Sequence, residues 1–424
     1  MHDQQAALRT AMKRLGLTRD AFADHLGVAR RALDSWLLPA TSREHRRMPG
    51  VVAKLLAGAP GVPAEAGGAQ GELRARFTKR GKPHLLSVAQ FDREAVEALL
   101  RVAEAMEPIA RRRKVTRVLE GAVLGNLFFE PSTRTRVSFG AAFCRLGGAV
   151  CDTTGFTFSS MAKGESIADT SRVVSGYVDA IVVRHPDKGS VAEFARHTHL
   201  PVINGGDGTG EHPTQALLDL YTIRREFARL GKEVDGARVA MVGDLRNGRT
   251  VHSLIRLLSL YRKLDFRLVA PRILEMPPEL VEATRAGGHR VTQTASLAEG
   301  LRDVDVLYAT RIQKERMAGE AMEAYPVDFR IDRATVDTHC RPDTIVMHPL
   351  PRDGTPGAND LSTDLDDDPR LAIFRQTDNG IPVRMAVFAV LLGVEHLVAR
   401  DLRDAPWMAP ARLGPGDAPF HRLA

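Results

Sequence analysis

The sequence predicts an α/β protein with two doubly wound parallel-sheet domains and a small all-α domain at the N-terminus. Three observations support this prediction. From about residue 84 onward, short apolar segments that end in polar residues alternate with helical patterns, which is typical of a parallel sheet with helices on both faces. Residues 1–58 carry helical patterns alone. The length of 424 residues allows two or three domains.

Residues 1–58 are predicted to be a helix-turn-helix-like module, in which residues 4–37 form short helices because apolar residues recur there at helical spacing. The segment LTRDAFADHLGVARRALDSWL resembles a helix-turn-helix, with Gly27 in the tight turn and a recognition helix from Ala29. A linker is predicted at residues 59–83, because the segment AGAPGVPAEAGGAQG that follows Leu56 is rich in glycine, alanine and proline.

The net charge of the chain is concentrated in this N-terminal region. The whole sequence has 59 Lys and Arg against 52 Asp and Glu, and residues 1–80 alone contain 14 basic and 7 acidic side chains, which accounts for the full surplus of +7. This charge favours a polyanion such as DNA as a partner, with Arg30 and Arg31 at the start of the recognition helix. Asp34 on the same helix argues against DNA, and a role of residues 1–58 in higher assembly is an equal alternative.

The apolar segments from residue 84 onward are predicted to be buried strands. They are VLEGAVLGNLFFE, VDAIVVRH, LPVING, ARVAMVGD, FRLVAP, DVLYATR and DTIVMHPL. The segment VSFGAAFCRL, by contrast, is predicted to be a helix. Because ligands of doubly wound folds bind at the carboxyl ends of the strands, the polar residues that follow these segments are candidates for a functional site.

The densest signal for a binding site is FFEPSTRTR, at residues 128–136. An apolar strand runs into Pro131, and the residues from Ser132 to Thr135 then open a helix. Backbone N–H groups, hydroxyls and the guanidinium of Arg134 would converge there, which favours a phosphate group as the ligand. The alternative is an ordinary helix whose N-terminus is capped by Ser or Thr.

PSTRTR resembles the carbamoyl-phosphate signature of the aspartate/ornithine carbamoyltransferase family. Further motifs of that family follow in order: KGESIADT at 163–170, VRHP at 183–186, HPTQ at 212–215, GDLRNGRTVHS at 243–253, TRIQKER at 310–316, HPLPR at 348–352 and FRQTDNGIPVRMAVFAVLLG at 374–393. The resemblance spans about residues 84–400. It implies a carbamoyl-phosphate-binding domain at 84–213 with a C-terminal helix of about 378–400 packed on it, an aspartate-binding domain at 214–377 and a tail at 401–424.

The resemblance also implies roles for individual residues. The phosphate would be held by Ser132, Thr133, Arg134 and Thr135. The carbonyl oxygen would be contacted by Thr135, Arg184 and His212, which would stabilise the oxyanion that develops during acyl transfer. The carbamoyl NH2 would be oriented by Gln215 and by the backbone carbonyls of Leu350 and Pro351. His212 is interpreted as a hydrogen-bond donor, and the leaving phosphate as the acceptor of the amine's proton.

The second substrate divides the family. HPLP, with Pro349 after His348, resembles the aspartate branch, whereas the ornithine branch has Cys at that position. The residues that match those holding the carboxylates of aspartate are Arg249, Arg311 and Gln313, and Lys163 is a further aspartate-binding residue that the resemblance implies. Two arginines suit a dicarboxylate on charge grounds. A carbamoyltransferase with another amine acceptor, such as an ornithine-like one, is the alternative.

Ser159 and Lys163 match a mobile loop that, in the family, reaches into the site of a neighbouring subunit. The resemblance therefore implies a homotrimer or a higher assembly of trimers, which would act in the cytoplasm at an early step of pyrimidine biosynthesis. It implies no metal or organic cofactor, and the three cysteines show no metal-ligand spacing. No apolar run approaches the ~18 residues of a membrane span.

Three features depart from the family pattern. Gly140 stands where Glu is usual, Glu211 would either raise the pKa of His212 or face solvent, and RDGTPGAND follows HPLP where a shorter segment is frequent. Two other classes of protein are alternatives. GDLRNGRT at 243–250 nearly matches a P-loop, and this near match would suit a nucleotide-dependent enzyme. A P-loop, however, has Lys where this segment has Arg. The helix-turn-helix would suit a DNA-binding regulator that uses the transferase body as a metabolite sensor.

Overall fold

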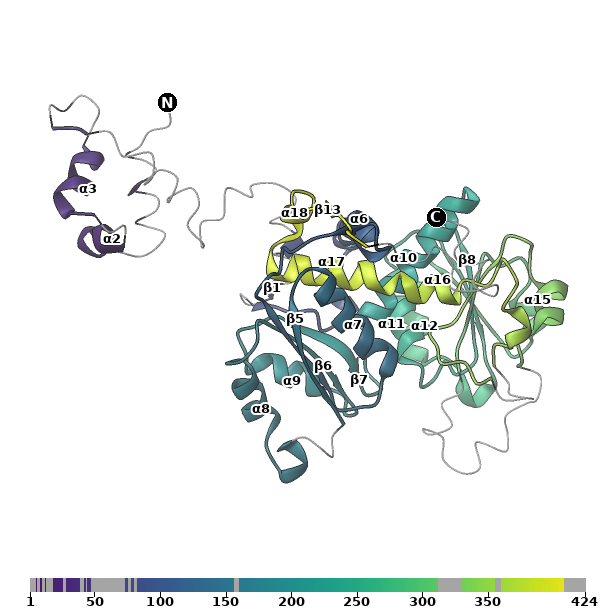
Figure 1. The fold of residues 1–424 in the computed structure, drawn as a ribbon. Helices are drawn as coiled ribbons and strands as arrows, with labels where there is room; N and C mark the ends of the chain where they lie inside the picture. The colour runs from purple at the N-terminus through teal and green to yellow at the C-terminus, as the bar shows by residue number, and fades with distance from the viewer. Residues whose placement is uncertain are drawn as a thin grey trace. The chain divides into compact units, whose positions relative to one another are not determined.

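The structure of the protein is a computed structural model (Figure 1). It describes residues 5, 8–9, 12, 18–25, 28–38, 42, 44–46, 73–74, 78–79, 82–155, 160–311, 329–354 and 360–407. The chain forms two compact units, residues 1–71 and 72–424. The larger unit contains two parallel sheets, so the prediction of an α/β protein with parallel sheets is confirmed.

The first sheet has four parallel strands in the order β5-β4-β6-β7. Its strands are β4 (Val123–Phe128), β5 (Ala149–Thr154), β6 (Ala180–His185) and β7 (Val202–Asp207), and the helices between them are α7 (Thr133–Arg145), α8 (Ile167–Val174) and α9 (Ser190–Arg196). The central strands β4 and β6 are buried along almost their whole length, as expected for strands that are covered on both faces.

The second sheet has five parallel strands in the order β10-β9-β8-β11-β12. Its strands are β8 (Arg238–Val242), β9 (Asp265–Val269), β10 (Arg290–Thr294), β11 (Val306–Ala309) and β12 (Ile345–Met347). Its helices are α10 (Pro213–Leu230), α11 (Arg249–Leu258), α12 (Pro278–Ala286), α13 (Leu297–Gly300), α15 (Arg333–His339) and α16 (Ile373–Asp378). All seven predicted apolar segments overlap a strand of one of the two sheets.

Helix α17 (Gly380–Leu392) joins the C-terminal part of the chain to the first sheet. It packs against α6 (Arg93–Ala110), α7 and α10, and it is buried on almost every side (Figure 1). The ring of Phe388 lies edge-on to Phe139 and Phe143 of α7, with centroid distances of 5.9 and 4.9 Å. The helix ends at Gly393, whose φ of +72° is a left-handed conformation that glycine adopts without strain.

Shorter elements complete the larger unit. They are β1 (Thr78–Lys79) paired with β2 (Lys82–Pro83), β3 (Lys114–Val115) paired with β13 (Arg403–Asp404), η1 (Val88–Gln90), η2 (Ser160–Lys163), η3 (Arg272–Leu274), η5 (Thr363–Leu365) and α18 (Glu395–Val398). Leu73 is buried in the main core, so this unit includes residues of the predicted linker 59–83. Within the described ranges, none of the helices is long and apolar enough to span a membrane.

In the N-terminal unit, the structure describes helices α2 (Arg19–His25) and α3 (Arg30–Leu37). Their apolar side chains form a small core of Leu8, Phe22, Ala23, Leu33, Trp36 and Leu37. Arg30 at the start of α3 forms ion pairs with Asp20 and with Asp34, the latter at 3.0 Å. Gly27, the residue predicted in the tight turn, lies outside the described residues.

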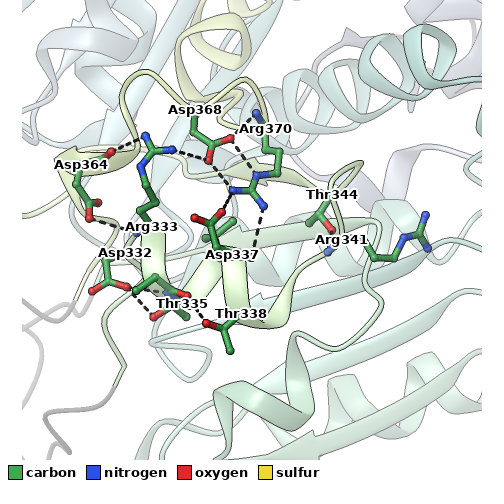
Figure 2. Close-up of polar contacts among 12 residues, drawn as sticks. Asp332, Arg333, Thr335, Asp337, Thr338, Arg341, Thr344, Asp364, Asp368 and Arg370 are labelled. Atoms are coloured by element: carbon green, nitrogen blue, oxygen red, sulfur yellow. Dashed lines mark hydrogen bonds and ion pairs between the residues drawn. The ribbon is translucent and has the colours of Figure 1, made fainter.

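A network of arginines and aspartates ties α15 to the chain that follows β12 (Figure 2). Asp368 is buried and accepts hydrogen bonds from Arg370 Nε at 3.0 Å and from Arg333 Nη1 at 3.3 Å. Arg370 also pairs with Asp337 of α15. Because each charge has a partner, the attraction between them offsets part of the cost of burying Asp368, and the network holds the segment after residue 360 on α15.

Candidate active site

A cavity of about 780 Å³ lies at the carboxyl ends of strands from both sheets. Residues that follow β4 and Arg184 near the end of β6 line the cavity, together with residues that follow β8, β11 and β12. Parallel sheets with helices on both faces commonly bind ligands at this edge. The cavity is therefore the candidate active site.

Three helices begin at the wall of this cavity. Helix α7 starts after Ser132, α10 after His212 and α11 after Gly248, and first-turn residues of each line the cavity. In the part of the chain that the structure describes, none of these three N-cap residues makes a side-chain capping bond. First-turn N–H groups and three positive helix-dipole ends are thus available to the cavity, which suits an anion.

The side chains add further positive charge. The arginines that line the cavity are Arg134, Arg184, Arg249, Arg311 and Arg384, and the carboxylates are Glu130 and Asp378. Desolvation, followed by the nearby charge of Arg311, lowers the pKa of Arg134. Burial lowers the pKa of Arg384 to about 10. The guanidiniums nevertheless stay protonated at neutral pH, so the cavity has an excess of positive charge.

Glu130 links two of these arginines. Its Oε2 accepts a hydrogen bond from Arg184 Nε at 3.0 Å and lies 3.4 Å from both terminal nitrogens of Arg249. Arg249 also donates to the carbonyl of Gly208 at 2.6 Å. At Gly206, with φ +132°, a Cβ would lie 3.2 Å from Arg184 Nη1, so this glycine leaves room for the guanidinium. Glu130 therefore connects the first sheet to the start of α11.

The surroundings of His212 favour a neutral imidazole, because they lower its pKa. Burial, and then the charges of Arg184, Arg249 and Arg384, lower its pKa well below the usual value. Its backbone N–H donates to Ser253 Oγ at 3.3 Å, and its Nδ1 has no hydrogen-bond partner among the described residues. A neutral imidazole carries one N–H, which it can donate to an oxyanion.

The preceding residue, Glu211, behaves differently from both sequence-based expectations. Its carboxylate accepts hydrogen bonds from Ser87 Oγ at 2.7 Å and from the backbone N–H of Val88 at 2.9 Å, and it lies 3.6 Å from Arg256 Nη1. It is partly buried rather than facing solvent. The pKa of His212 is lowered rather than raised, because burial and three arginines act on it.

The loop after β12 is held by His348. The backbone N–H of Leu350 donates to His348 Nδ1 at 2.8 Å, and His348 Nε2 lies 3.0 Å from Asp360 Oδ1, with both side chains buried. Asp360 also accepts from the backbone N–H of Asp353 at 2.7 Å. These contacts hold Leu350 at φ +58°, an uncommon conformation for leucine, and so fix the direction of its carbonyl.

The structure brings most of the predicted site residues together. Those that line the cavity are Ser132, Thr133, Arg134, Thr135, Arg184, His212, Gln215, Arg249, Arg311, Leu350 and Pro351. Lys163, at the end of η2, is exposed and is not among the described residues that line the cavity. Ser159, Gln313 and residues 355–359 of RDGTPGAND lie outside the described residues.

Other residues of the cavity were not identified from the motifs: Glu130, Ser138, Thr250, Gln376 and Arg384. For Arg384 the sequence held a usable signal. It is the lone charged residue of the apolar helix α17. A charge inside a buried helix is costly unless it is paired or hydrogen-bonded, so it indicates a polar site nearby. Glu130 and Ser138 flank the PSTRTR helix start, but neighbouring a motif does not by itself indicate a role.

The segment 243–250, which nearly matches a P-loop, is arranged differently from one. The backbone N–H groups of Leu245 and Asn247 are already bonded within the chain, at 2.9 to 3.1 Å. Arg249 is directed at Glu130 and at a backbone carbonyl. A P-loop needs its N–H groups for the phosphates and a lysine to reach them. The structure thus gives the nucleotide-dependent alternative no support.

The fold and the cavity define an α/β protein with two parallel sheets and a cationic site for small anions. Two family models match the chain: the carbamoyl-P binding domain of aspartate/ornithine carbamoyltransferases at residues 83–225, and their Asp/Orn binding domain at residues 235–391. The chain therefore belongs to the aspartate/ornithine carbamoyltransferase family, which is a family of enzymes.

Individual relatives agree with this assignment. The chain is 56% identical over 341 residues to the aspartate carbamoyltransferase catalytic subunit of Dichelobacter nodosus, covering 80% of this chain and 98% of that one. Identity to the catalytic subunit of Archaeoglobus fulgidus is 46% over 313 residues, or 73% and 99% of the two chains. Aspartate transcarbamoylase from Trypanosoma cruzi, crystallised with carbamoyl phosphate and aspartate, matches with a TM-score of 0.68 and 39% identity, covering 74% of this chain and 97% of that chain.

Proposed function

We propose that the protein is an aspartate carbamoyltransferase, which converts carbamoyl phosphate and L-aspartate to N-carbamoyl-L-aspartate and phosphate. The observation that carries this proposal is the cationic cavity, where five arginines and three helix N-termini suit a dianionic phosphate and a dicarboxylate in one space. The activity named for the relatives, and the ligands of the related crystal structure, support it.

In this reaction the amine of aspartate attacks the carbamoyl carbon. A C–N bond forms, the C–O bond to phosphate breaks, and the phosphate leaves with that electron pair and accepts the amine's proton. Negative charge develops on the carbonyl oxygen, and we assign its stabilisation to Thr135, Arg184 and His212. Because His212 is neutral, it would act by donating its N–H. Ser132 and Arg134 would hold the phosphate at the start of α7.

Aspartate is the favoured acceptor because of the charges on the second half of the cavity. Arg249 and Arg311 would bind its two carboxylates, with Gln313 as a further contact. A diamino acid would bring a second ammonium group among guanidiniums, where like charges repel. Glu130 offers it little compensation, since its carboxylate is already paired with Arg184 and Arg249.

An assay of carbamoyl transfer to aspartate, ornithine and other amines tests the proposal. We expect turnover with aspartate, and a loss of roughly 100-fold in kcat/KM for carbamoyl phosphate in Arg134→Ala, because a charged contact to the phosphate disappears. Arg136→Ala is the matched control, since Arg136 lies on the same helix but pairs with Asp152 at 3.6 Å and is not among the described lining residues. Turnover with ornithine alone would refute aspartate as the acceptor. No turnover with any amine would refute the proposal that the protein is a carbamoyltransferase.

We further propose that the active unit is a homotrimer in which Ser159 and Lys163 complete a neighbouring site. The exposure of Lys163, away from the cavity of its own chain, supports this. Mixing the Lys163→Ala and Arg134→Ala proteins, followed by dissociation and reassociation, should restore activity, because some sites then combine both intact residues. Each variant reassociated with itself is the control. No recovery in the mixture would argue against shared sites.

For residues 1–58 we propose a helix-turn-helix-like all-α module that promotes higher assembly. The ion pairs of Arg30 with Asp20 and Asp34 favour assembly over DNA binding, because they neutralise a side chain expected to meet phosphates. Sizing the full chain against one that lacks residues 1–71 tests this. Equal mass per catalytic unit would exclude the assembly role, and salt-dependent binding of the full chain to duplex DNA would favour the other one.

A further inference from the structure

Asp219 is a buried carboxylate behind the wall of the cavity, one helical turn after Gln215 on α10. Three side chains donate hydrogen bonds to it. Its Oδ1 accepts from Gln215 Nε2 at 2.9 Å and from Gln376 Nε2 at 2.6 Å. Its Oδ2 accepts from the hydroxyl of Tyr308 at 2.7 Å. The proposed reaction gives Asp219 no part, although burying a carboxylate is costly.

Each donor leads to a different wall of the cavity. Gln215 lines the cavity itself. Gln376 also lines it, and its Oε1 accepts the backbone N–H of His348 at 3.0 Å, which connects Asp219 to the loop after β12. The hydroxyl of Tyr308, on β11, shares a hydrogen bond with Thr250 at the start of α11. One carboxylate thus joins elements from both halves of the site.

The hydrogen bond from Gln215 determines which way round its amide lies. An ionised carboxylate can only accept hydrogen bonds, so the NH2 of Gln215 must face Asp219. The amide oxygen is then the group that Gln215 offers to the cavity. That oxygen can accept a hydrogen bond from an NH2 group of a ligand, whereas a methyl group in the same place has nothing to donate.

We propose that Asp219 is a positioning residue that makes the site select a carbamoyl over an acetyl donor, because its carboxylate holds the Gln215 amide with the oxygen toward the substrate's NH2. The inference rests on the proposed function of the site. It assigns part of the substrate specificity to a residue that does not touch the substrate. A site built to accept from an NH2 discriminates well against an analogue that lacks it.

The ionisation of Asp219 bears on this role. Burial raises its pKa to about 7, against the lowering effect of its three hydrogen bonds and of Arg384. The other ionisable groups that face it are Tyr308 on β11, whose pKa is raised well above its usual value, and Arg384 on α17. Both keep their protons near neutral pH. A protonated Asp219 no longer offers acceptors to all three donors. Gln215 should therefore keep its orientation above pH 7 and lose it as the pH falls below 7.

The Asp219→Asn variant tests the inference, since it preserves volume but places an NH2 among three donors. We expect kcat/KM for carbamoyl phosphate to fall about tenfold or more, because the Gln215 amide loses its fixed orientation. The inhibition constant of acetyl phosphate, which has CH3 in place of NH2, should stay unchanged. Asp368→Asn is the matched control, because Asp368 is also a buried carboxylate that accepts hydrogen bonds and is not among the described residues that line the cavity. Asp368→Asn should lower the free energy of unfolding but leave both kcat/KM for carbamoyl phosphate and the inhibition constant of acetyl phosphate unchanged.

A second measurement separates positioning from a merely structural role. If Asp219 acts through Gln215, Asp219→Asn should have little effect once Gln215→Ala has removed that side chain. An equal loss in both backgrounds would overturn the inference. If Asp219→Asn does not fold, Tyr308→Phe removes one donor and raises the pKa of Asp219, which should move the acid limb of the kcat/KM profile to higher pH. An unmoved limb would overturn it too.

The outcomes also separate this inference from the function on which it rests. A folded wild-type protein without carbamoyl transfer to any amine would refute the proposed function. An active wild type, together with an Asp219→Asn variant that keeps the full preference for carbamoyl over acetyl phosphate, would refute the positioning role alone.

Discussion

The neutral imidazole of His212 leads to a prediction that separates hydrogen-bond donation from proton transfer. His212→Ala removes one donor to the developing oxyanion. Loss of a single such donor typically costs about 3 kcal/mol, so we expect kcat to fall roughly 100- to 1,000-fold. His212→Asn keeps a side-chain N–H and should recover part of that loss. Steady-state assays at saturating concentrations of both substrates measure these values.

The same variants should reveal how His212 contributes to the pH profile. Its pKa is lowered well below the usual value by burial and by three arginines, so the imidazole stays neutral across the neutral range. Because burial raises the pKa of Asp219 to about 7, we expect an acid limb in that range to persist in His212→Asn. His252→Asn is the control, because His252 is a buried histidine of α11 that bonds the Leu245 carbonyl at 2.7 Å and is not among the described lining residues. A limb that disappears in His212→Asn but persists in Asp219→Asn would refute the reasoning.

Three further changes probe the site and its scaffold. Gly140→Ala should raise the free energy of unfolding by about 1 kcal/mol in denaturant titrations, because Gly140 lies inside α7 and an added Cβ would meet only Val150 Cγ1, at 4.0 Å. No gain in stability would show that the site is less open than it looks. Glu130→Gln removes the charge that holds two cavity arginines together and should lower kcat/KM for both substrates about tenfold or more; unchanged kinetics would contradict this. Asp360→Asn loosens the loop after β12 and should raise KM for carbamoyl phosphate more than KM for aspartate. Equal changes in the two constants would count against a local effect.

The central strands and the edge strands β7 and β12 could be predicted from the sequence, but the edge strands β5 and β10 could not. β6 is buried at all six positions, so its residues form a continuous apolar run that is visible in the sequence. β5 and β10 lie at the edges of their sheets. Cys151 and Asp152 of β5 are exposed, and Val291 is the one buried residue of β10. Edge strands of this kind have neither an apolar run nor a regular alternation, so only pairing in the folded protein reveals them.

A similar distinction applies to the candidate site. The residues of PSTRTR and of HPTQ are each contiguous in the chain. A strand followed by a helix start was enough to indicate PSTRTR, and the resemblance to the family indicated HPTQ. The contacts of Asp219 come from α10, β11 and α16, and Tyr308 and Gln376 lie far from it in the sequence. Within α10, Asp219 is one polar residue on a buried helix. Its role depends on three donors that meet only when both sheets are assembled.

The distribution of charge explains why overall composition says little about the substrates. Outside residues 1–80 the chain has 45 basic and 45 acidic side chains, yet the cavity contains five arginines and two carboxylates. Carboxylates are used to pair arginines in other parts of the larger unit, as around Asp368 (Figure 2). The attraction for anionic substrates therefore comes from groups at contact distance in a partly desolvated space, where salt screens weakly. Any attraction of DNA to residues 1–58 would instead come from exposed charges and would decline steeply with salt. Attraction inside the cavity acts at short range, and attraction of DNA would act at long range. We therefore expect the KM values to change little over a series of salt concentrations. A steep loss of DNA binding over the same series would show that the basic surplus of residues 1–80 attracts DNA.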